Sequence, residues 1–183
     1  MLALAGCTRV QHEALPPERG APVTAPGRLR IVIFELGGVD VPFHTGLIAH
    51  VDGQTTIYDP AGVWEPASDA CLRRGESVSG ITPAEEEAYL TRSGIRYALG
   101  DWVTHVFDVA VPPEVARLAV QRMGQRPQSL PLHCAHNVSS LLAGLPGFDW
   151  VEPHRITADF LDDLLARDDL TYARRTARPA QTG

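Results

Sequence analysis

Cysteine is scarce in this chain of 183 residues, which contains three, at positions 7, 71 and 134. Three widely spaced cysteines do not make a disulfide framework, and no two of them have the CxxC spacing of a redox or zinc motif. His133, Cys134 and His136 are metal-ligating residue types, but no second group of cysteines and histidines completes a zinc site. We therefore expect neither a metal nor another cofactor.

Long apolar runs and basic clusters are also missing. No stretch approaches the roughly 18 apolar residues that a membrane-spanning helix requires. The formal net charge is -6, and no basic face is visible of the kind that binds phosphates, so we expect no nucleic-acid partner. With 44% hydrophobic and 21% charged residues, the composition is that of a globular protein, and the length suits one domain.

The start of the chain has an unusual pattern. Leu4-Ala5-Gly6-Cys7 resembles the bacterial lipobox, in which a small residue precedes a cysteine that becomes the diacylated mature N-terminus. Only six residues precede Cys7 and none is basic, so we expect the true start codon to lie upstream. Residues 1–27 are thus expected to be a lipobox remnant and a flexible tether rich in Pro, Glu, Gln and Gly. The resemblance implies a periplasmic protein with a lipid anchor, more in keeping with the outer than the inner membrane because Thr8 follows the cysteine.

Residues 28–171 are expected to form the folded domain, which begins with strands. The dipeptide Asp52-Gly53 between two β-branched segments is a strong signal for a two-residue hairpin. The segment 64–80 has no clear period and is expected to be a long loop. The expected strands are 28–36, 43–51, 54–58 and 102–110.

Capping residues mark the expected helices. Thr82-Pro83-Ala84-Glu85 combines a threonine cap, a proline at the first helical position and a glutamate three residues after the cap. Three or four antiparallel strands with segregated helices predict an α+β domain, a small antiparallel sheet packed against helices. Residues 172–183 are polar and basic and are expected to be a disordered tail. The expected helices run from Thr82 to Ser93 or Tyr97, from Pro112 to Gly124, from Cys134 to about Leu145, and onward from a Thr157 cap.

Cys134 is a candidate nucleophile. It lies in the first turn of an expected amphipathic helix, just after a loop that contains Pro131. Unpaired amides at a helix start lower the pKa of a thiol and favour the thiolate, which attacks carbonyl carbons. A single cysteine on a helix is ordinarily a buried and unreactive thiol. A catalytic role for Cys134 therefore requires a partner base.

His44 is the candidate base and Asp59 the candidate third member of a triad. If the hairpin turn centres on Asp52-Gly53, paired residues sum to 105, and His44 and Asp59 become diagonal neighbours on one face. A carboxylate there can hold the imidazole tautomer and stabilise the imidazolium. An odd-length turn would instead offer Thr56 or Tyr58.

Two other histidines lie on expected strands. His50 shares the face of His44 but lies roughly 20 Å further along the strand, too far to join the same triad. His105 alternates with apolar residues and can face either the core or the site. A histidine at such a position ordinarily has a structural role and is hydrogen-bonded within the fold.

The runs HTGLI from His44 and CAHN from Cys134 together resemble the permuted papain-like superfamily, the NlpC-type fold in the order of lecithin:retinol acyltransferase-like proteins. The resemblance covers about residues 28 to 145. It implies a circularly permuted papain-like fold with His44 as base and Cys134 as nucleophile. The acyltransferase branch has Asn-Cys-Glu-His-Phe around its nucleophile, where this chain has His133-Cys134-Ala135-His136-Asn137.

The sequence thus favours a lipid-anchored cysteine hydrolase of the cell envelope that cleaves an amide, such as a peptidoglycan stem peptide. The expected partners are a cell-wall peptide or lipidated substrate, and a membrane through the anchor on Cys7. Two alternatives stay open: a thioesterase or acyltransferase acting on a lipid, and an envelope lipoprotein that binds without catalysis. Thiol reactivity separates the last from the other two.

Overall fold

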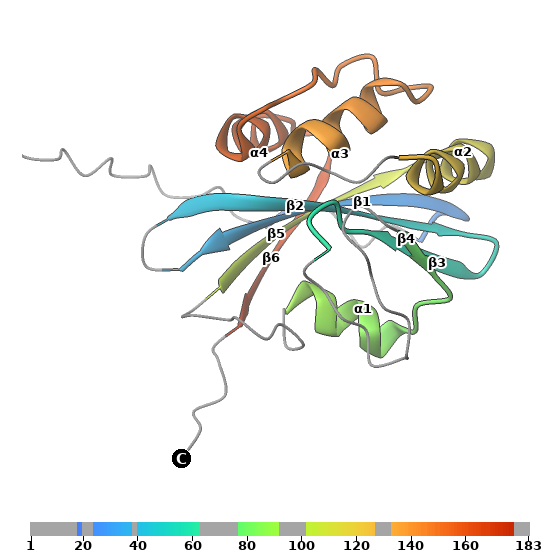
Figure 1. Cartoon of the computed structure of the whole chain (residues 1–183), viewed down its shortest axis with the longest axis horizontal. Coiled ribbons are helices and arrows are strands. Elements are labelled where there is room, and N and C mark those ends of the chain that lie inside the picture. The colour runs from blue at the N-terminus through green and yellow to red at the C-terminus, as the bar shows by residue number, and fades with distance from the viewer. Residues whose placement is uncertain are drawn as a thin grey trace, which may run out of the picture.

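The computed structural model describes residues 18–19, 24–37, 40–62, 77–91, 102–126 and 133–177. They form an α+β architecture in which a six-stranded antiparallel sheet lies between helices (Figure 1). The strand order is β4-β3-β2-β1-β5-β6, so the expected α+β class is confirmed, with six strands rather than three or four. The strands are β1 (Gly27–Leu36), β2 (Val41–Val51), β3 (Gln54–Tyr58), β4 (Ser77–Ser79), β5 (Trp102–Ala110) and β6 (Thr171–Ala177). The helices are α1 (Pro83–Leu90), α2 (Pro113–Gly124), α3 (Cys134–Ala143) and α4 (Thr157–Leu165).

The β2–β3 hairpin has the register expected from the sequence. Val51 pairs with Gln54 and Leu47 with Tyr58, so every pair sums to 105. Asp52 and Gly53 have φ values of 55° and 71°, the left-handed conformations of a type I′ turn whose twist matches the flanking strands. This register decides which side chains of β2 and β3 share a face.

Two strands were not anticipated. Part of the expected loop 64–80 forms β4, which pairs with β3, while residues 63–76 lie outside the described part of the chain. The tail expected to be disordered from residue 172 instead continues β6 to Ala177, paired with β5. Of the β6 side chains whose burial is described, 171–176, only Tyr172 is deeply buried, against Phe107. An edge strand held mainly by backbone hydrogen bonds needs few apolar residues, which explains why a polar composition concealed it.

The α1 capping box is present as expected, but the helix is shorter than the sequence indicated. Glu85 N–H donates to the Thr82 hydroxyl, and the Glu85 carboxylate accepts from Thr82 N–H. The helix ends at Leu90, and residues 92–100 are not described. In α4, Thr157 is the first helical residue and Ile156 is the cap, without a side-chain capping bond.

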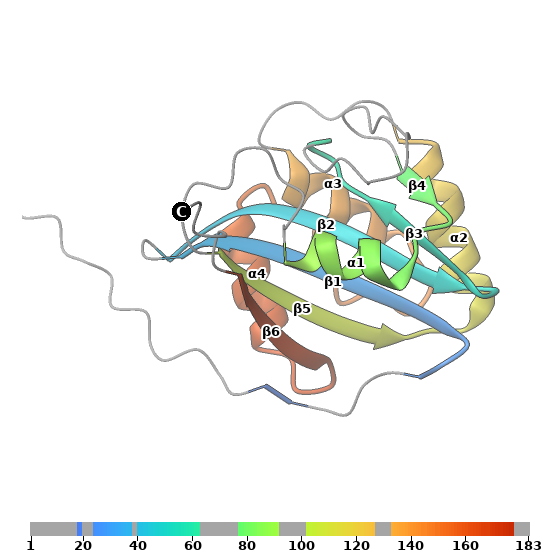
Figure 2. The ribbon, with the colours of Figure 1, turned by 90° about the horizontal axis from the view of Figure 1, so that it is seen from below.

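The helices divide the core into two layers. Helices α2, α3 and α4 cover one face of the sheet, and α1 covers the other (Figures 1 and 2). The larger cluster takes the odd-numbered residues of β1 and β2, for example Ile31 and Leu47, and the smaller one takes even-numbered residues such as Val32 and Ile48. This alternation is the period-2 pattern of strands buried on both faces. No helix in the described ranges is long and apolar enough to cross a membrane.

The segment expected to be a tether makes contacts where it is described. Backbone N–H and C=O of Arg19 both bond to Tyr172, at 2.9 Å each. The Arg19 guanidinium donates to the carbonyl oxygens of Leu165 and Arg167 at the end of α4. A tether that begins at Cys7 would therefore end before residue 18 rather than at residue 27, because these bonds attach Arg19 to the outer strand of the sheet.

Candidate active site

Cys134 begins α3 beside a stretch of β2 that lies beyond its pairing with β3. Strand β3 pairs with β2 only as far as Leu47 and Tyr58, after which the chain turns away at Asp59. The Cys134 thiol lies against the backbone of this stretch: Sγ donates to the Phe43 carbonyl oxygen over 3.7 Å, and the Thr45 N–H donates to Sγ. These two bonds to residues on either side of His44 hold the sulfur next to His44.

The surroundings of the free Cys134 thiol favour the thiolate. The side chain is 5% exposed, and burial by itself raises the pKa of the thiol. A hydrogen bond and the charge of His44, together with the N–H groups of Thr45 and Ala135, outweigh burial, and the pKa lies below its ordinary value. The residue has the electrostatic setting of a nucleophile rather than of an inert core thiol.

His44, the candidate base indicated by the sequence, lies beside Cys134. Its ring is 3% exposed and stacks on Phe34, with centroids 5.5 Å apart and planes 10° from parallel. Burial lowers the pKa of the imidazole, but the charge and hydrogen bond of Asp59 and the contact with Cys134 raise it to about 9. A raised histidine pKa beside a lowered cysteine pKa is the pattern of a thiolate–imidazolium pair.

Asp59 contacts His44, as the hairpin calculation predicted. Its Oδ1 lies 2.9 Å from Nε2, close enough for an ion pair although not aligned like a regular hydrogen bond. The same oxygen accepts from the N–H groups of Ala61 and Gly62 at 3.0 and 3.1 Å, which holds the fully buried carboxylate in a tight turn. Since Nε2 faces Asp59, Nδ1 is the ring nitrogen left for the thiol. The structure therefore brings Cys134, His44 and Asp59 together.

The two residues expected for an odd-length turn, Thr56 and Tyr58, have other surroundings than the His44 ring. Thr56 Oγ1 bonds to Ser79 Oγ of β4 at 2.9 Å. Tyr58 lies on the opposite face of the sheet, in the larger core cluster, because the turn has an even length.

The two remaining strand histidines have structural partners. His50 Nε2 lies 3.1 Å from Glu86, and burial, followed by the charges of Arg28 and Arg30, lowers the pKa of His50 to about 4. His105 is fully buried between Glu35, 3.1 Å from its Nε2, and the Tyr172 hydroxyl, 3.0 Å from its Nδ1. Both belong to polar networks within the fold.

Three contributors to the site were missed by the sequence analysis. Phe34 fixes the plane of the imidazole, and the backbone groups of Phe43 and Thr45 hold the sulfur. Backbone groups carry no side-chain signal. A sequence signal did exist in the turn at Asp59-Pro60-Ala61-Gly62, because a strand that ends there leaves the neighbouring edge open.

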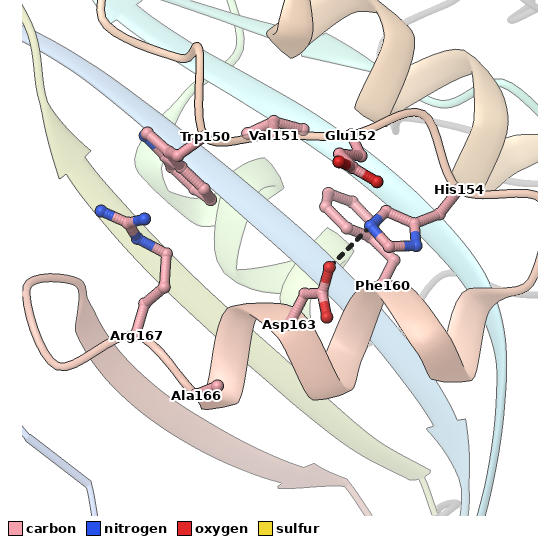
Figure 3. A pocket seen from close by; sticks show the side chains of 8 residues that line it. All are labelled: Trp150, Val151, Glu152, His154, Phe160, Asp163, Ala166 and Arg167. Carbon is pink, nitrogen blue, oxygen red and sulfur yellow. Dashed lines mark ion pairs between the residues drawn. The ribbon is translucent and has the colours of Figure 1, made fainter.

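A cavity of about 180 Å³ lies elsewhere, between α4 and the segment before it (Figure 3). His154 forms an ion pair with Asp163 at 3.0 Å, and the guanidinium of Arg167 stacks over Trp150 at 3.9 Å. Its lining includes none of the three candidate catalytic residues. The Ser139 hydroxyl of α3 accepts from the N–H of His154, one of the residues that line the cavity, at 2.8 Å.

Metal binding gains no support from the geometry: the described ranges contain no group of three or more His, Cys, Asp or Glu arranged to hold an ion. The lipidation candidate Cys7 and the second thiol, Cys71, lie outside the described residues. Comparison with protein-family models, with curated proteins and with solved structures finds no match for the chain. Functional inference therefore rests on the residues and their geometry.

Proposed function

We propose that the protein is a cysteine hydrolase that cleaves an amide, of the class of peptidoglycan stem peptides, with Cys134 as nucleophile and His44 as base. The observation that carries this proposal is the buried Cys134–His44–Asp59 arrangement, in which the pKa of the thiol is lowered and that of the imidazole is raised to about 9. Structural cysteines and histidines have no need of such a paired shift, whereas nucleophilic catalysis depends on it.

In the proposed reaction the Cys134 thiolate attacks the carbonyl carbon, a sulfur–carbon bond forms, and the carbonyl electron pair moves onto oxygen. The Cys134 N–H at the start of α3 donates to that oxygen. The tetrahedral intermediate collapses, the carbon–nitrogen bond breaks, and the amine takes a proton from the His44 imidazolium. Water, deprotonated by neutral His44, then attacks the thioester and releases a carboxylic acid and the thiolate.

The proposed fold family is the circularly permuted papain-like superfamily. In support, a histidine on a strand precedes a cysteine at the start of a helix, and their side chains meet although 90 residues separate them. A carboxylate on the far ring nitrogen fits the same scheme. The order of the two elements along the chain is the basis for proposing the permuted form.

Acylation by p-nitrophenyl acetate tests the proposal, because this activated ester reports attack on a carbonyl without knowledge of the natural substrate. We expect a burst of p-nitrophenol and an acetyl group on Cys134, located by peptide mapping, with little label on Cys71. The Cys134→Ala variant should show no burst. If the wild-type protein is not acylated at Cys134, the hydrolase proposal is wrong, and the alternative of an envelope protein that binds without catalysis is favoured.

One observation favours the second candidate, a thioesterase or acyltransferase acting on a lipid. Phe43, half-buried, tilts over Trp102 with ring centroids 5.1 Å apart, and 50% of the nearby Val41 is exposed. Val41 and Phe43 lie on β2 just before His44, and Trp102 begins β5, so an acyl chain has an apolar surface to contact. Acylation that becomes faster along a series of p-nitrophenyl esters from acetate to decanoate would favour the lipid substrate over the stem peptide.

Lipid anchoring through Cys7, with a periplasmic and outer-membrane location, is a separate proposal supported by the lipobox-like start. When the protein is expressed in its native host, Cys7→Ser should move it from the membrane fraction to the soluble one, because the acyl chains supply the membrane affinity. Fractionation followed by immunoblotting measures this, with Cys71→Ser as control. Retention of Met1 in the mature protein would contradict the anchor and leave the proposed active site unaffected.

A further inference from the structure

Tyr58 carries a hydroxyl group that has no hydrogen-bond partner among the described residues. The side chain is fully buried in the larger core cluster, and among the described residues no donor or acceptor bonds to its Oη. Buried polar groups are almost always paired, because an unpaired one destabilises the fold. A phenylalanine would fill the same space without destabilising the fold in this way. The hydroxyl therefore suggests a role other than stability.

The position of Tyr58 relates it to the candidate active site. It is the last residue of β3 and pairs with Leu47, two residues from Thr45, whose N–H donates to the Cys134 sulfur. Side chains alternate along a strand, so Tyr58 faces the α3 layer whereas Asp59, the next residue, faces His44. Tyr58 and the His44–Asp59 pair therefore flank Cys134 from opposite faces of the sheet.

The electrostatics agree with this placement. Burial raises the pKa of Tyr58, Arg126 opposes the rise, and the negative charges of Asp59 and Cys134 add to it, for a pKa of about 12. The Tyr58 hydroxyl is therefore close enough to Cys134 for the charge of the thiolate to affect its pKa. It also remains protonated, and hence a hydrogen-bond donor, throughout the pH range in which the thiolate is formed.

Acyl transfer at Cys134 needs more than one donor for the oxyanion, and α3 offers few. The Ala135 N–H already donates to Sγ, and the Asn137 N–H donates to the His133 carbonyl oxygen. Within the described residues no side chain caps the helix, so the Cys134 N–H is a backbone donor available next to the reacting sulfur. A side-chain donor from another element would complete the pair.

We propose that the Tyr58 hydroxyl is this second donor, a catalytic residue that hydrogen-bonds the substrate's carbonyl oxygen as it becomes the oxyanion. The inference rests on the proposed hydrolase function. The hydroxyl donates a hydrogen bond and keeps its proton: the oxygen gains the carbonyl electron pair on attack and returns it when the leaving group departs.

Tyr58→Phe tests the proposal through two reactions of the same sulfur. Alkylation by iodoacetamide is a displacement at a saturated carbon and forms no oxyanion, so its rate should be unchanged. Acylation by p-nitrophenyl acetate forms the oxyanion, and its rate should fall by about 100-fold, the effect of removing one oxyanion donor. The unfolding midpoint in urea should stay equal or rise, because the substitution removes an unpaired buried hydroxyl.

Tyr172→Phe is the matched control, since it removes a buried hydroxyl that does have a partner, His105 at 3.0 Å. It should lower the unfolding midpoint and leave acylation by the folded protein unchanged. Equal acylation rates in wild type and Tyr58→Phe would overturn the proposed role of Tyr58 and leave the proposed hydrolase function standing. So would an equal loss of both reactions in Tyr58→Phe, which would mean an effect on the thiolate. Absence of acylation in the wild type would overturn the hydrolase function and this inference with it.

Discussion

His44→Gln should reduce the acylation of Cys134 by about 10⁴-fold or more, because glutamine of similar size can neither accept the thiol proton nor protonate a leaving group. The variant should also raise the pKa of Cys134. Burial then acts on the thiol with only the N–H groups of Thr45 and Ala135 against it. Alkylation by iodoacetamide at pH 6, fast in the wild type, should become slow and recover only in alkaline solution. Stopped-flow alkylation between pH 4 and 10 measures this shift.

His50→Gln is the matched control for His44→Gln. His50 lies on the same strand, and its pKa of about 4 means that it carries no charge at pH 6. Its replacement should alter neither alkylation nor acylation. A Cys134 whose alkylation profile is the same in wild type and His44→Gln would contradict the thiolate–imidazolium pair.

Asp59→Asn should lower kcat by about 10⁴-fold, the effect of removing the charge of the third triad member while its shape is kept. An asparagine Oδ1 can still accept from the Ala61 and Gly62 N–H groups, so the turn should persist. Without the carboxylate, burial dominates and the pKa of His44 falls. The alkaline limb of the pH–rate profile, at about pH 9 in the wild type, should then move to lower pH.

The same variant changes the pH dependence of stability. In the wild type the folded-state pKa of His44 lies above its ordinary 6.5, so the charged pair with Asp59 stabilises the fold fully below pH 6.5. That contribution disappears as the pH rises through about 9. Urea unfolding at pH 6 and pH 9.5 should show this loss in the wild type and little of it in Asp59→Asn. A variant with wild-type kcat and wild-type pH dependence would remove Asp59 from the site.

Much of the candidate site followed from local rules. The two-residue turn at Asp52-Gly53 sets the hairpin register, and the register puts His44 and Asp59 on one face with Gly46 between them. A side chain at Gly46 would collide with the Tyr89 hydroxyl of α1, so the glycine lets Tyr89 pack directly against this strand. The start of α3 at Cys134 is likewise a local property of the loop and helix sequence.

The tertiary structure decided what lies next to the nucleophile. Residues 43 and 134 are 91 positions apart, and no pattern within either segment predicts that the Cys134 sulfur will bond to the backbone of Phe43. The same is true of β6, whose polar sequence forms a strand only because β5 supplies its hydrogen-bond partners. The sequence by itself determined β1, β2, β3 and β5, the Thr82 cap of α1 and the residues of the hairpin that share a face, because turn dihedrals and side-chain alternation act over a few residues. Only the tertiary structure decided that Cys134 meets His44 and that the Tyr58 hydroxyl has no hydrogen-bond partner among the described residues, because those contacts depend on how the whole sheet and its helices pack.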